Sequence, residues 1–497
     1  MKIGILTFHS QLNYGGVLQC WALQEALTRL FKEKVKSKSE KVEMEVVDHW
    51  LSPDNWRLER GYNRMGWKAW VKFWVKALLG LGVDQHWLRT KRTQKFVRGK
   101  LNLTPFHFCG WEELGALGDR ALPLGGESGH AVRVTLPDLL VVGSDQVWNP
   151  SWAHTRFYLC EGAGDVKRIS YAVSIGVKSL EKKVEKVGGG GQRSDFNRGE
   201  HKEKAEWPSW VGEDVVEGYR KALGKFAAIS CREEEACEIV RNLGFEATHV
   251  VDPTLLLTKD EWLSLIKNGR VDRENREKSV YRENSTRSTR STRLKNLPAL
   301  PIYTAKKLVC YFLSEDVEAA RPLLEKFAKE QNCRVEILIG ENSGAGMLPL
   351  PISPSRLRRW LGGLCRRFFS RVHVNIAAGP LEFVRLHAEA TWIVTDSFHS
   401  VMFSTIFGKN CRALAPKVEW RKDMFARIEE IAEHAHMKVE ELKGCKVEKL
   451  NSFGLIANDL TEALNSFRRG NAVTVDQEWV AKRRSDSIEW LKEAINA

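Results

Sequence analysis

The stretch TWIVTDSFHSVMFSTIFGKN, residues 391–410, shows most clearly how this chain folds. It begins as a continuous apolar strand, turns through a polar cluster at residues 396–400, and continues as a helix whose apolar residues recur at helical spacing. The first backbone N–H groups of a helix lack internal partners and carry partial positive charge, so phosphates and carboxylates bind there. His399, within this cluster, can add a proton or a further donor to a bound anion. The stretch therefore predicts an anion-binding strand–helix junction, against the alternative that a lone histidine is a satisfied packing residue.

The same alternation of short apolar runs and helical patterns continues along the chain. Several runs are apolar at consecutive positions, which is typical of parallel strands covered by helices on both faces. We therefore expect an α/β fold of two doubly wound, Rossmann-like domains that face one another across a cleft, followed by a helical C-terminal tail. The predicted strands are Lys2–Phe8, Glu43–Asp48, Asp138–Gly143, Arg168–Ile175, Phe226–Cys231, Ala247–Asp252, Lys307–Leu313, Arg334–Ile339, Arg371–Ile376, Thr391–Asp396 and Asn410–Ala415.

Shifts in composition predict where the domains begin and end. A basic, low-complexity segment separates the two domains, and two Gly-rich or charged inserts interrupt the first. The tail closes with the amphipathic pattern RRSDSIEWLKEAI. The predicted divisions are an N-terminal domain at 1–265 with inserts near 115–133 and 182–208, a linker at 266–304, a C-terminal domain at 305–430 and C-terminal helices at 431–497.

The formal net charge of +14 over 497 residues predicts a surface that meets anions, such as a polyanionic glycan, an acidic lipid surface or nucleic acid. Part of this excess lies in the Arg-Ser-Thr repeats at 270–295, which read as a solvated insert and describe no binding face. No recognised nucleic-acid-binding motif accompanies the charge, so we expect no nucleic-acid partner.

The ten cysteines are scattered, with no CxxC pair and no Cys/His cluster at zinc spacing. Reduced, mostly buried thiols and a cytoplasmic location are expected, and no metal is required. The chain begins directly with a strand and shows no signal peptide, and no apolar run reaches the length of a membrane span. A basic, tryptophan-rich stretch at 64–80 either lies on the inner face of a membrane or packs its tryptophans on the protein.

Polar clusters follow several predicted strands, at the positions where ligands bind in open α/β sheets. The first, FHSQLNYGGVLQCWALQEAL at 8–27, has Gly15 and Gly16 for close backbone approach and Asn13 or Ser10 as a helix cap. It is not GxGxxG, and the chain has no Walker sequence, which disfavours a standard dinucleotide or P-loop site. An ordinary strand–helix turn and a ligand loop both remain open for this cluster.

The second cluster lies in VVGSDQVWNP at 141–150. Asp145 can act as a base or orient a hydroxyl, and Gln146 and Asn149 can bind sugar hydroxyls. The alternative is a capped turn around a buried Trp148.

The third cluster, ISCREEEACEIV at 229–240, places Arg232 directly after a buried strand and before a helix. A guanidinium there can hold a carboxylate or phosphate bidentately. The alternative is a surface ion pair with Glu235, three residues further on. The carboxylates at 233–235 and 429–430 are expected to be solvent contacts on charged helix faces.

A set of motifs occurs together and in order: FHSQLNYGGVLQCWALQ, DLLVVGSDQVWNP, ISYAVSIG, ISCREEEACEIV, VVDPTLLL, AGPLEFVRLHAEA and TWIVTDSFHSVMFSTIFGK. By these motifs the chain resembles the polysaccharide pyruvyl transferase family over nearly its whole length. The resemblance implies a two-domain fold like that of the GT-B glycosyltransferases. It also implies transfer of the enolpyruvyl unit of phosphoenolpyruvate, the donor substrate, to hydroxyls of a cell-surface glycan or lipid-linked saccharide. A pyruvate ketal forms, phosphate leaves, and no cofactor takes part.

The resemblance further implies which residues act. Family members hold the donor with the arginine that corresponds to Arg232 and with an Arg-x-His triplet whose histidine corresponds to His399. The triplet here reads Ser-Phe-His, so Ser397 stands where the family has arginine, and Ser400 replaces the usual glycine. The expected catalytic residues are His399 and Asp145. The expected donor contacts are Arg232, Ser397 and Ser400, and the expected acceptor contacts are Asn13, Tyr14 and Gln146.

The serine at 397 leaves the donor open, because either another basic residue supplies the missing charge or the donor differs. Two further functions remain as alternatives. One is a nucleotide-sugar glycosyltransferase of the GT-B type, and the other is a catalytically silent relative that binds a glycan.

Overall fold

The computed structural model describes residues 1–9, 12–35, 42–49, 85–105, 110–111, 121–123, 131–133, 136–152, 154–180, 215–267, 306–313, 316–340, 370–415, 422–434, 438–440, 455–470 and 472–497. The chain divides into two compact units. Unit 1 comprises Met1–Leu257, Pro416–Ala435 and Asp476–Ala497, and unit 2 comprises Thr258–Ala415 and His436–Val475. The tryptophan-rich stretch at 64–80 and the predicted insert at 182–208 lie outside the described residues, as does nearly all of the linker at 266–304.

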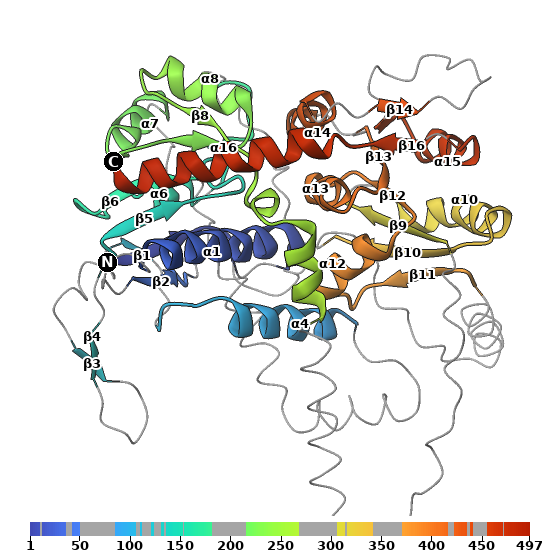
Figure 1. Cartoon of the computed structure of the whole chain (residues 1–497), viewed down its shortest axis with the longest axis horizontal. Coiled ribbons are helices and arrows are strands. Elements are labelled where there is room, and N and C mark those ends of the chain that lie inside the picture. The colour runs from blue at the N-terminus through green and yellow to red at the C-terminus, as the bar shows by residue number, and fades with distance from the viewer. Residues whose placement is uncertain are drawn as a thin grey trace, which may run out of the picture. The chain divides into compact units, whose positions relative to one another are not determined.

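Unit 1 is built on a four-stranded parallel sheet of order β2-β1-β5-β6 (Figure 1). Isolated parallel bridges from Ile169 to Ala228 and from Val173 to Cys231 lead from this sheet to the parallel pair β7–β8. The strands of unit 1 are β1 (Lys2–Leu6), β2 (Glu43–Val46), β5 (Leu139–Val142), β6 (Lys167–Ser170), β7 (Ser230–Cys231), β8 (Thr248–His249) and the separate hairpin β3 (Ala121–Pro123) and β4 (Ala131–Arg133). Its helices are α1 (Tyr14–Val35), α4 (Gln85–Lys100), α6 (Thr155–Tyr158), α7 (Val215–Leu223), α8 (Glu234–Asn242), the 3-10 turn η1 (Pro253–Leu256), α14 (Lys422–His434) and α16 (Gln477–Asn496).

Consecutive apolar residues produce the central strands of unit 1. All four residues of β5 are buried, so both faces of this strand lie under other elements. Its core cluster joins β5 to Trp148 in the following loop and to apolar residues of α7 and α8, such as Tyr219 and Val240. The carboxyl ends of β1, β5, β6 and β7 therefore point to one edge of the unit, where the polar clusters follow.

Unit 2 holds a six-stranded parallel sheet of order β11-β10-β9-β12-β13-β15, which is a doubly wound topology. Its strands are β9 (Lys307–Phe312), β10 (Arg334–Ile339), β11 (Val372–Asn375), β12 (Trp392–Thr395), β13 (Asn410–Leu414), β15 (Ile456–Ala457) and the antiparallel pair β14 (Lys438–Glu440) and β16 (Ala472–Thr474). Its helices are α10 (Val317–Glu330), α12 (Pro380–Glu389), α13 (Phe398–Phe407) and α15 (Leu460–Arg468). Every residue of β12 and α13 is buried, so this strand and helix lie in the core of the unit.

The predicted α/β class is confirmed, and each predicted strand overlaps an observed one; β6 begins one residue before the predicted Arg168–Ile175 and ends at Ser170. The division of the chain differs from the predicted C-terminal domain at 305–430 and C-terminal helices at 431–497, because parts of both ranges belong to unit 1. Helix α14 belongs to unit 1 because Glu430 bonds to the start of α8, and α16 belongs there because Ser487 accepts a hydrogen bond from the Val251 amide. The tail is also not wholly helical, since β15 pairs with β13 in the sheet of unit 2.

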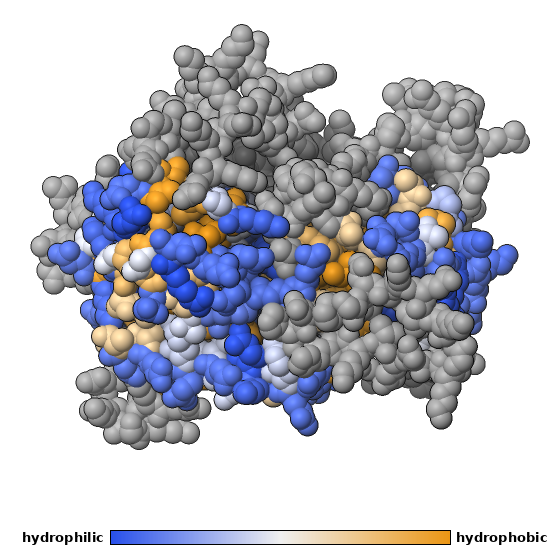
Figure 2. All heavy atoms as spheres, turned by 90° about the horizontal axis from the view of Figure 1, so that it is seen from above, coloured by the Kyte–Doolittle hydropathy of each residue, from blue (hydrophilic) through white to orange (hydrophobic). Residues whose placement is uncertain are grey.

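In Figure 2, hydrophilic side chains cover most of the described part of the face shown, with smaller apolar patches between them. No described helix combines the length and hydrophobicity needed to cross a membrane.

Candidate functional site

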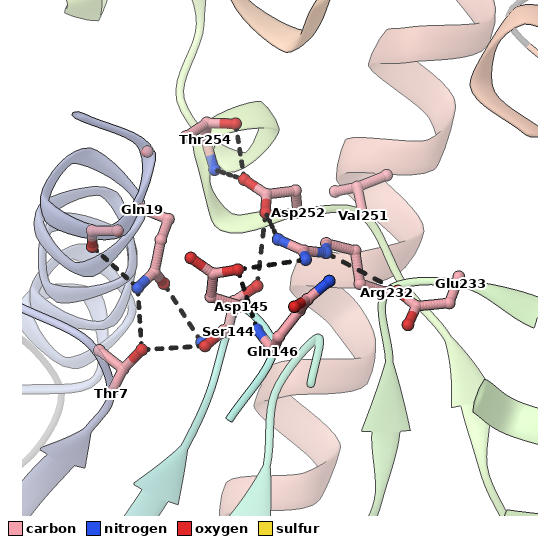
Figure 3. Close-up of polar contacts among 12 residues, drawn as sticks. Thr7, Gln19, Ser144, Asp145, Gln146, Arg232, Glu233, Val251, Asp252 and Thr254 are labelled. Atoms are coloured by element: carbon pink, nitrogen blue, oxygen red, sulfur yellow. Dashed lines mark hydrogen bonds and ion pairs between the residues drawn. The ribbon is translucent and has the colours of Figure 1, made fainter. Parts of the chain in front are cut away.

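Hydrogen bonds fix the loop that follows β5. The hydroxyl of Thr7 donates to the carbonyl oxygen of Ser144 over 2.9 Å, and the amide of Ser144 donates to Gln19 Oε1 over 3.2 Å. Gln19 Nε2 in turn donates to Thr7 Oγ1 over 2.8 Å, which closes a small network between β1, α1 and this loop (Figure 3). Because all three side chains are buried, the network holds the loop in one position.

Glycine and positive φ angles turn the chain sharply at this point. Gly143 has a φ of +112°, and a Cβ there would lie 2.4 Å from the carbonyl oxygen of Tyr171, so only glycine fits. Asp145 has a φ of 72°, and its Oδ1 accepts a hydrogen bond from the amide of Gln146 over 2.9 Å. A Cβ on Gly16 would lie 3.8 Å from Asp145 Oδ2, so the glycine pair of the first loop brings α1 up to this carboxylate.

Arg232 lies at the centre of a buried charge cluster. Its Nη1 donates to Asp252 Oδ2 over 3.0 Å and its Nη2 to Asp145 Oδ1 over 3.4 Å, while its Nε is 3.8 Å from Glu233 Oε2 (Figure 3). The side chain of Arg232 is 1% exposed. Asp252 is held in turn by the amide and hydroxyl of Thr254, over 2.9 and 2.7 Å. The cluster thus joins the loop after β5 to the ends of β7 and β8.

The predicted alternative of a surface ion pair between Arg232 and Glu235 is wrong. Burial disfavours the charge on Arg232, but the carboxylates of Asp145, Asp252 and Glu233 outweigh it and raise the pKa of the guanidinium above its ordinary value. Arg232 is therefore permanently charged, and its hydrogen bonds to Asp252 and Asp145 hold the guanidinium in one plane.

Helix α14 adds two residues that the sequence analysis did not single out as functional. Arg427 is 6% exposed. Its burial, followed by the nearby charge of Arg232, lowers its pKa to about 10, so it remains a cation at pH 7. Glu430, one turn further on, accepts a weak hydrogen bond from the Glu234 amide over 3.4 Å and lies 3.2 Å from His249 Nε2.

The prediction that the carboxylates at 429–430 contact solvent holds for Glu429, which is exposed, and is wrong for Glu430. Burial, and then the charges of Glu233 and Glu235, raise the pKa of Glu430 to about 8. The spacing of Arg427 and Glu430, which puts both on one helix face, was the available signal. It could not show that this face packs against α8.

The predicted acceptor contacts all lie at or near the first two polar loops. Asn13 Oδ1 accepts a hydrogen bond from the amide of Gly15 over 3.0 Å and so caps α1. Tyr14 is 1% exposed and lies under the guanidinium of Arg89, 4.5 Å from its ring centre. Gln146 is buried, and its Nε2 finds no hydrogen-bond partner among the described residues. Gln146 is therefore the most suitable of the three for a ligand hydroxyl.

Unit 2 contains the remaining predicted residues at the start of α13. Ser397 is the N-cap residue of this helix, although its hydroxyl caps no described amide, and His399 occupies the first turn with 8% exposure. The hydroxyl of Ser400 lies 2.7 Å from Nε2 of the buried His387, whose Nδ1 donates to the carbonyl oxygen of Phe383. The hydroxyl of Ser400 therefore donates its hydrogen to His387, and the expected contact of Ser400 with the donor substrate stays a prediction.

The structure brings Asp145, Gln146 and Arg232 together in unit 1, and Ser397, His399 and Ser400 together in unit 2. Their roles, and the expectation that the two domains face one another, stay predictions. Of the second cluster, Trp148 is fully buried and its indole donates to the carbonyl oxygen of Tyr158 over 3.1 Å. The alternative of a turn around a buried Trp148 is therefore confirmed, while the ligand interpretation of Asp145, Gln146 and Asn149 stays a prediction.

Fold and site together define an α/β protein with parallel sheets and a buried arginine–carboxylate cluster at the carboxyl ends of its strands. A match to the family described as polysaccharide pyruvyl transferase covers residues 13–417, which is most of the chain. The protein belongs to this family of transferases. No curated protein matches the sequence.

Several solved structures resemble the chain distantly. UDP-GlcNAc 2-epimerase from Neisseria meningitidis, bound to UDP-GlcNAc, is 11% identical with a TM-score of 0.43, over 100% of this chain and 99% of that one. UDP-GlcNAc 2-epimerase from Methanocaldococcus jannaschii is 11% identical with a TM-score of 0.37, over 94% and 99%. The calicheamicin glycosyltransferase CalG4 is 12% identical with a TM-score of 0.35, over 99% and 94%.

Proposed function

We propose that the protein transfers the enolpyruvyl unit of phosphoenolpyruvate to two hydroxyls of a sugar, forming a pyruvate ketal and releasing phosphate. The observation that carries this proposal is a buried arginine, Arg232, held by carboxylates directly after β7 in a chain that belongs to the polysaccharide pyruvyl transferase family. The acceptor is a sugar of a cell-surface glycan or of a lipid-linked saccharide.

The donor is a small, multiply charged anion, so its site needs fixed cations and oriented N–H groups. Arg232 supplies one cation, and its bonds to Asp145 and Asp252 fix the plane of its guanidinium. Arg427, which is also buried, supplies a second cation in the same unit. In unit 2, the first turn of α13 offers backbone N–H groups and the imidazole of His399 to a phosphate or carboxylate.

The reaction needs a proton, a nucleophile and a leaving group. Protonation of the donor's methylene carbon creates an oxocarbenium ion at C2, which a sugar hydroxyl attacks. A second hydroxyl of the same sugar then displaces phosphate and closes the ketal, so that each hydroxyl loses one proton. We assign His399 as the general acid or phosphate partner and Asp145 as the base or orienting group for the acceptor hydroxyl. Gln146 contacts the acceptor.

The test is phosphate release from phosphoenolpyruvate in the presence of a panel of glycans, with the pyruvylated product identified by mass. Release that depends on one acceptor, together with a pyruvylated product, supports the proposal. Release of a nucleoside diphosphate from a nucleotide sugar would instead identify a glycosyltransferase. Glycan binding without consumption of any donor would identify a silent binding protein.

Two histidines of unit 2, His399 and His373, provide a matched test of the proposed general acid. His399→Ala should lower ketal formation by about 10² to 10⁴, the usual contribution of general acid–base catalysis. His373→Ala, which changes a half-buried histidine of β11, should leave turnover near that of the parent. Full turnover by His399→Ala would remove this residue from the mechanism.

A cytoplasmic location, with peripheral contact at the inner face of a membrane where lipid-linked saccharides are assembled, is part of the same proposal. The described cysteines, which are free and buried, suit a reducing compartment. Flotation of the protein with anionic liposomes tests the membrane contact. Lys-to-Glu changes in the stretch at 64–80 should abolish flotation if that stretch makes the contact.

A further inference from the structure

The loop that carries Asp145 and Gln146 continues into two consecutive turns that end at Trp152. The amide of Asn149 donates to the carbonyl oxygen of Gln146 over 3.2 Å. The amide of Trp152 donates to the carbonyl oxygen of Asn149 over 3.1 Å. The hydroxyl of Thr155 donates to the carbonyl oxygens of both Asn149 and Trp152. Residue 152 is therefore held at a fixed place relative to the loop after β5.

The side chain of Trp152 remains 41% exposed, although it is a large apolar group. Only Met1 and Leu323 among the other large hydrophobic side chains of the described residues are similarly exposed. The indole packs on Phe8, with ring centres 5.5 Å apart and planes inclined by 31°, and Phe8 in turn meets the edge of Tyr158 at 5.2 Å. The ring of Trp152 is therefore supported by Phe8 but still exposes apolar surface to solvent. This exposure is unfavourable, and a ligand that covers the ring would remove the apolar surface from water.

Polar groups suited to a sugar lie on the loop that leads to Trp152. A Cβ on Gly16 would lie 3.5 Å from Phe8 Cβ and 3.8 Å from Asp145 Oδ2, so the residue that supports Trp152 lies beside the proposed base. Gln146 Nε2 is buried and has no hydrogen-bond partner among the described residues, and Gln146 directly follows Asp145, the carboxylate that Arg232 contacts (Figure 3). An unsatisfied buried donor of this kind is costly unless a ligand accepts its hydrogen bond.

We propose that Trp152 is the stacking platform of the acceptor subsite and binds the C–H face of a hexopyranose ring, while Gln146 binds a hydroxyl on the edge of the bound sugar. A pyranose presents an apolar face of C–H groups and a polar rim of hydroxyls. An aromatic ring and a carboxamide on one loop complement these two parts. The subsite deepens the proposed function, since it names the chemistry that selects the acceptor.

The experiment measures glycan binding without donor, by saturation-transfer NMR and calorimetry, for the parent and three variants. Trp152→Ala should weaken acceptor binding about ten-fold, corresponding to about 1.4 kcal/mol. Trp152→Phe, which keeps an aromatic face, should stay within about three-fold of the parent. Leu323→Ala removes an equally exposed apolar side chain from α10 in unit 2 and should bind glycan as the parent does. In turnover assays, Trp152→Ala should raise the KM for the acceptor and leave the KM for phosphoenolpyruvate unchanged.

Parent-like glycan binding by Trp152→Ala would overturn the proposal, as would a parent protein that binds no glycan of the panel. Equal loss in Trp152→Ala and Trp152→Phe, with both KM values raised together, would show a role in packing and not in stacking. If no donor is consumed but Trp152→Ala still loses glycan binding, the platform stands and the assignment of phosphoenolpyruvate fails. The two failures are therefore distinguishable.

Discussion

Glu430 allows a sharp test of how α14 packs against the arginine cluster. Its side chain is 14% exposed, and its Oε1 accepts a hydrogen bond from the Glu234 amide. The same oxygen lies 3.2 Å from His249 Nε2. Burial and two neighbouring glutamates raise its pKa from 4.5 to about 8. The carboxyl is therefore mostly protonated in the folded protein at pH 7, whereas it is ionised in the unfolded chain.

The sign and size of the effect on stability follow from this difference. Between pH 4.5 and about 8 the folded state binds more protons than the unfolded state, so the free energy of unfolding falls as pH rises. The contribution of the protonated Glu430 carboxyl to the free energy of unfolding is complete below pH 4.5 and is lost above about pH 8. A pKa change of this size corresponds to at most about 5 kcal/mol. Glu430→Gln removes the ionisation, so the variant should gain up to this amount over the parent as pH rises through the interval.

Urea unfolding at pH 5.0, 6.5 and 8.5 measures the difference between variant and parent. At pH 5.0, where Glu430 still contributes most of its stabilisation, the free energy of unfolding of Glu430→Gln should lie within about 1 kcal/mol of the parent's. At pH 8.5 the variant should be more stable than the parent by several kcal/mol. Glu429→Gln, a change at the exposed neighbour, is the matched control and should follow the parent at every pH. A Glu430→Gln protein whose stability runs parallel to that of the parent across this range would refute the burial of Glu430 between α14 and α8.

Three further substitutions test the site and its supports. Arg232→Ala leaves two aspartates buried without their cation, so the free energy of unfolding should fall by about 3 to 5 kcal/mol and phosphoenolpyruvate binding should be lost; an unchanged urea midpoint would contradict the buried pairing. Gly143→Ala forces a Cβ to within 2.4 Å of the Tyr171 carbonyl oxygen at a positive φ, and should destabilise by more than about 2 kcal/mol in urea unfolding, whereas a neutral result would show that the turn can relax. Ser400→Ala leaves the Nε2 of His387 without its donor and should cost about 1 to 3 kcal/mol in the same assay, and a neutral variant would place another donor there.

The parallel sheets could be predicted from the sequence because burial on both faces requires consecutive apolar residues. The edge at which Asp145 and Arg232 meet could also be predicted, since the carboxyl ends of parallel strands lie together. What could not be predicted was the burial of Arg232. A guanidinium followed by three glutamates resembles an exposed helix start, and its strongest partner, Asp252, lies 20 residues further along the chain.

The contribution of α14 was beyond sequence reasoning for the same physical cause. Glu430 and the Glu234 amide are separated by 196 residues, and no local pattern reports contact at that distance. Strands as short as β15, with two residues, are also too brief to show a period of two. Trp152 was missed because exposure of one aromatic ring depends on packing around it and leaves no trace in composition.

The most direct measurement follows phosphorus and glycan together in one reaction. Phosphorus NMR of the parent protein with phosphoenolpyruvate and the acceptor found in the panel would report phosphate, while mass spectrometry of the same sample reports the pyruvylated sugar. Enolpyruvyl transfer predicts that the two products appear in a one-to-one ratio and that neither forms without the acceptor. Phosphate released with no change in the glycan, or phosphoenolpyruvate left intact while a nucleotide sugar is consumed, would contradict it.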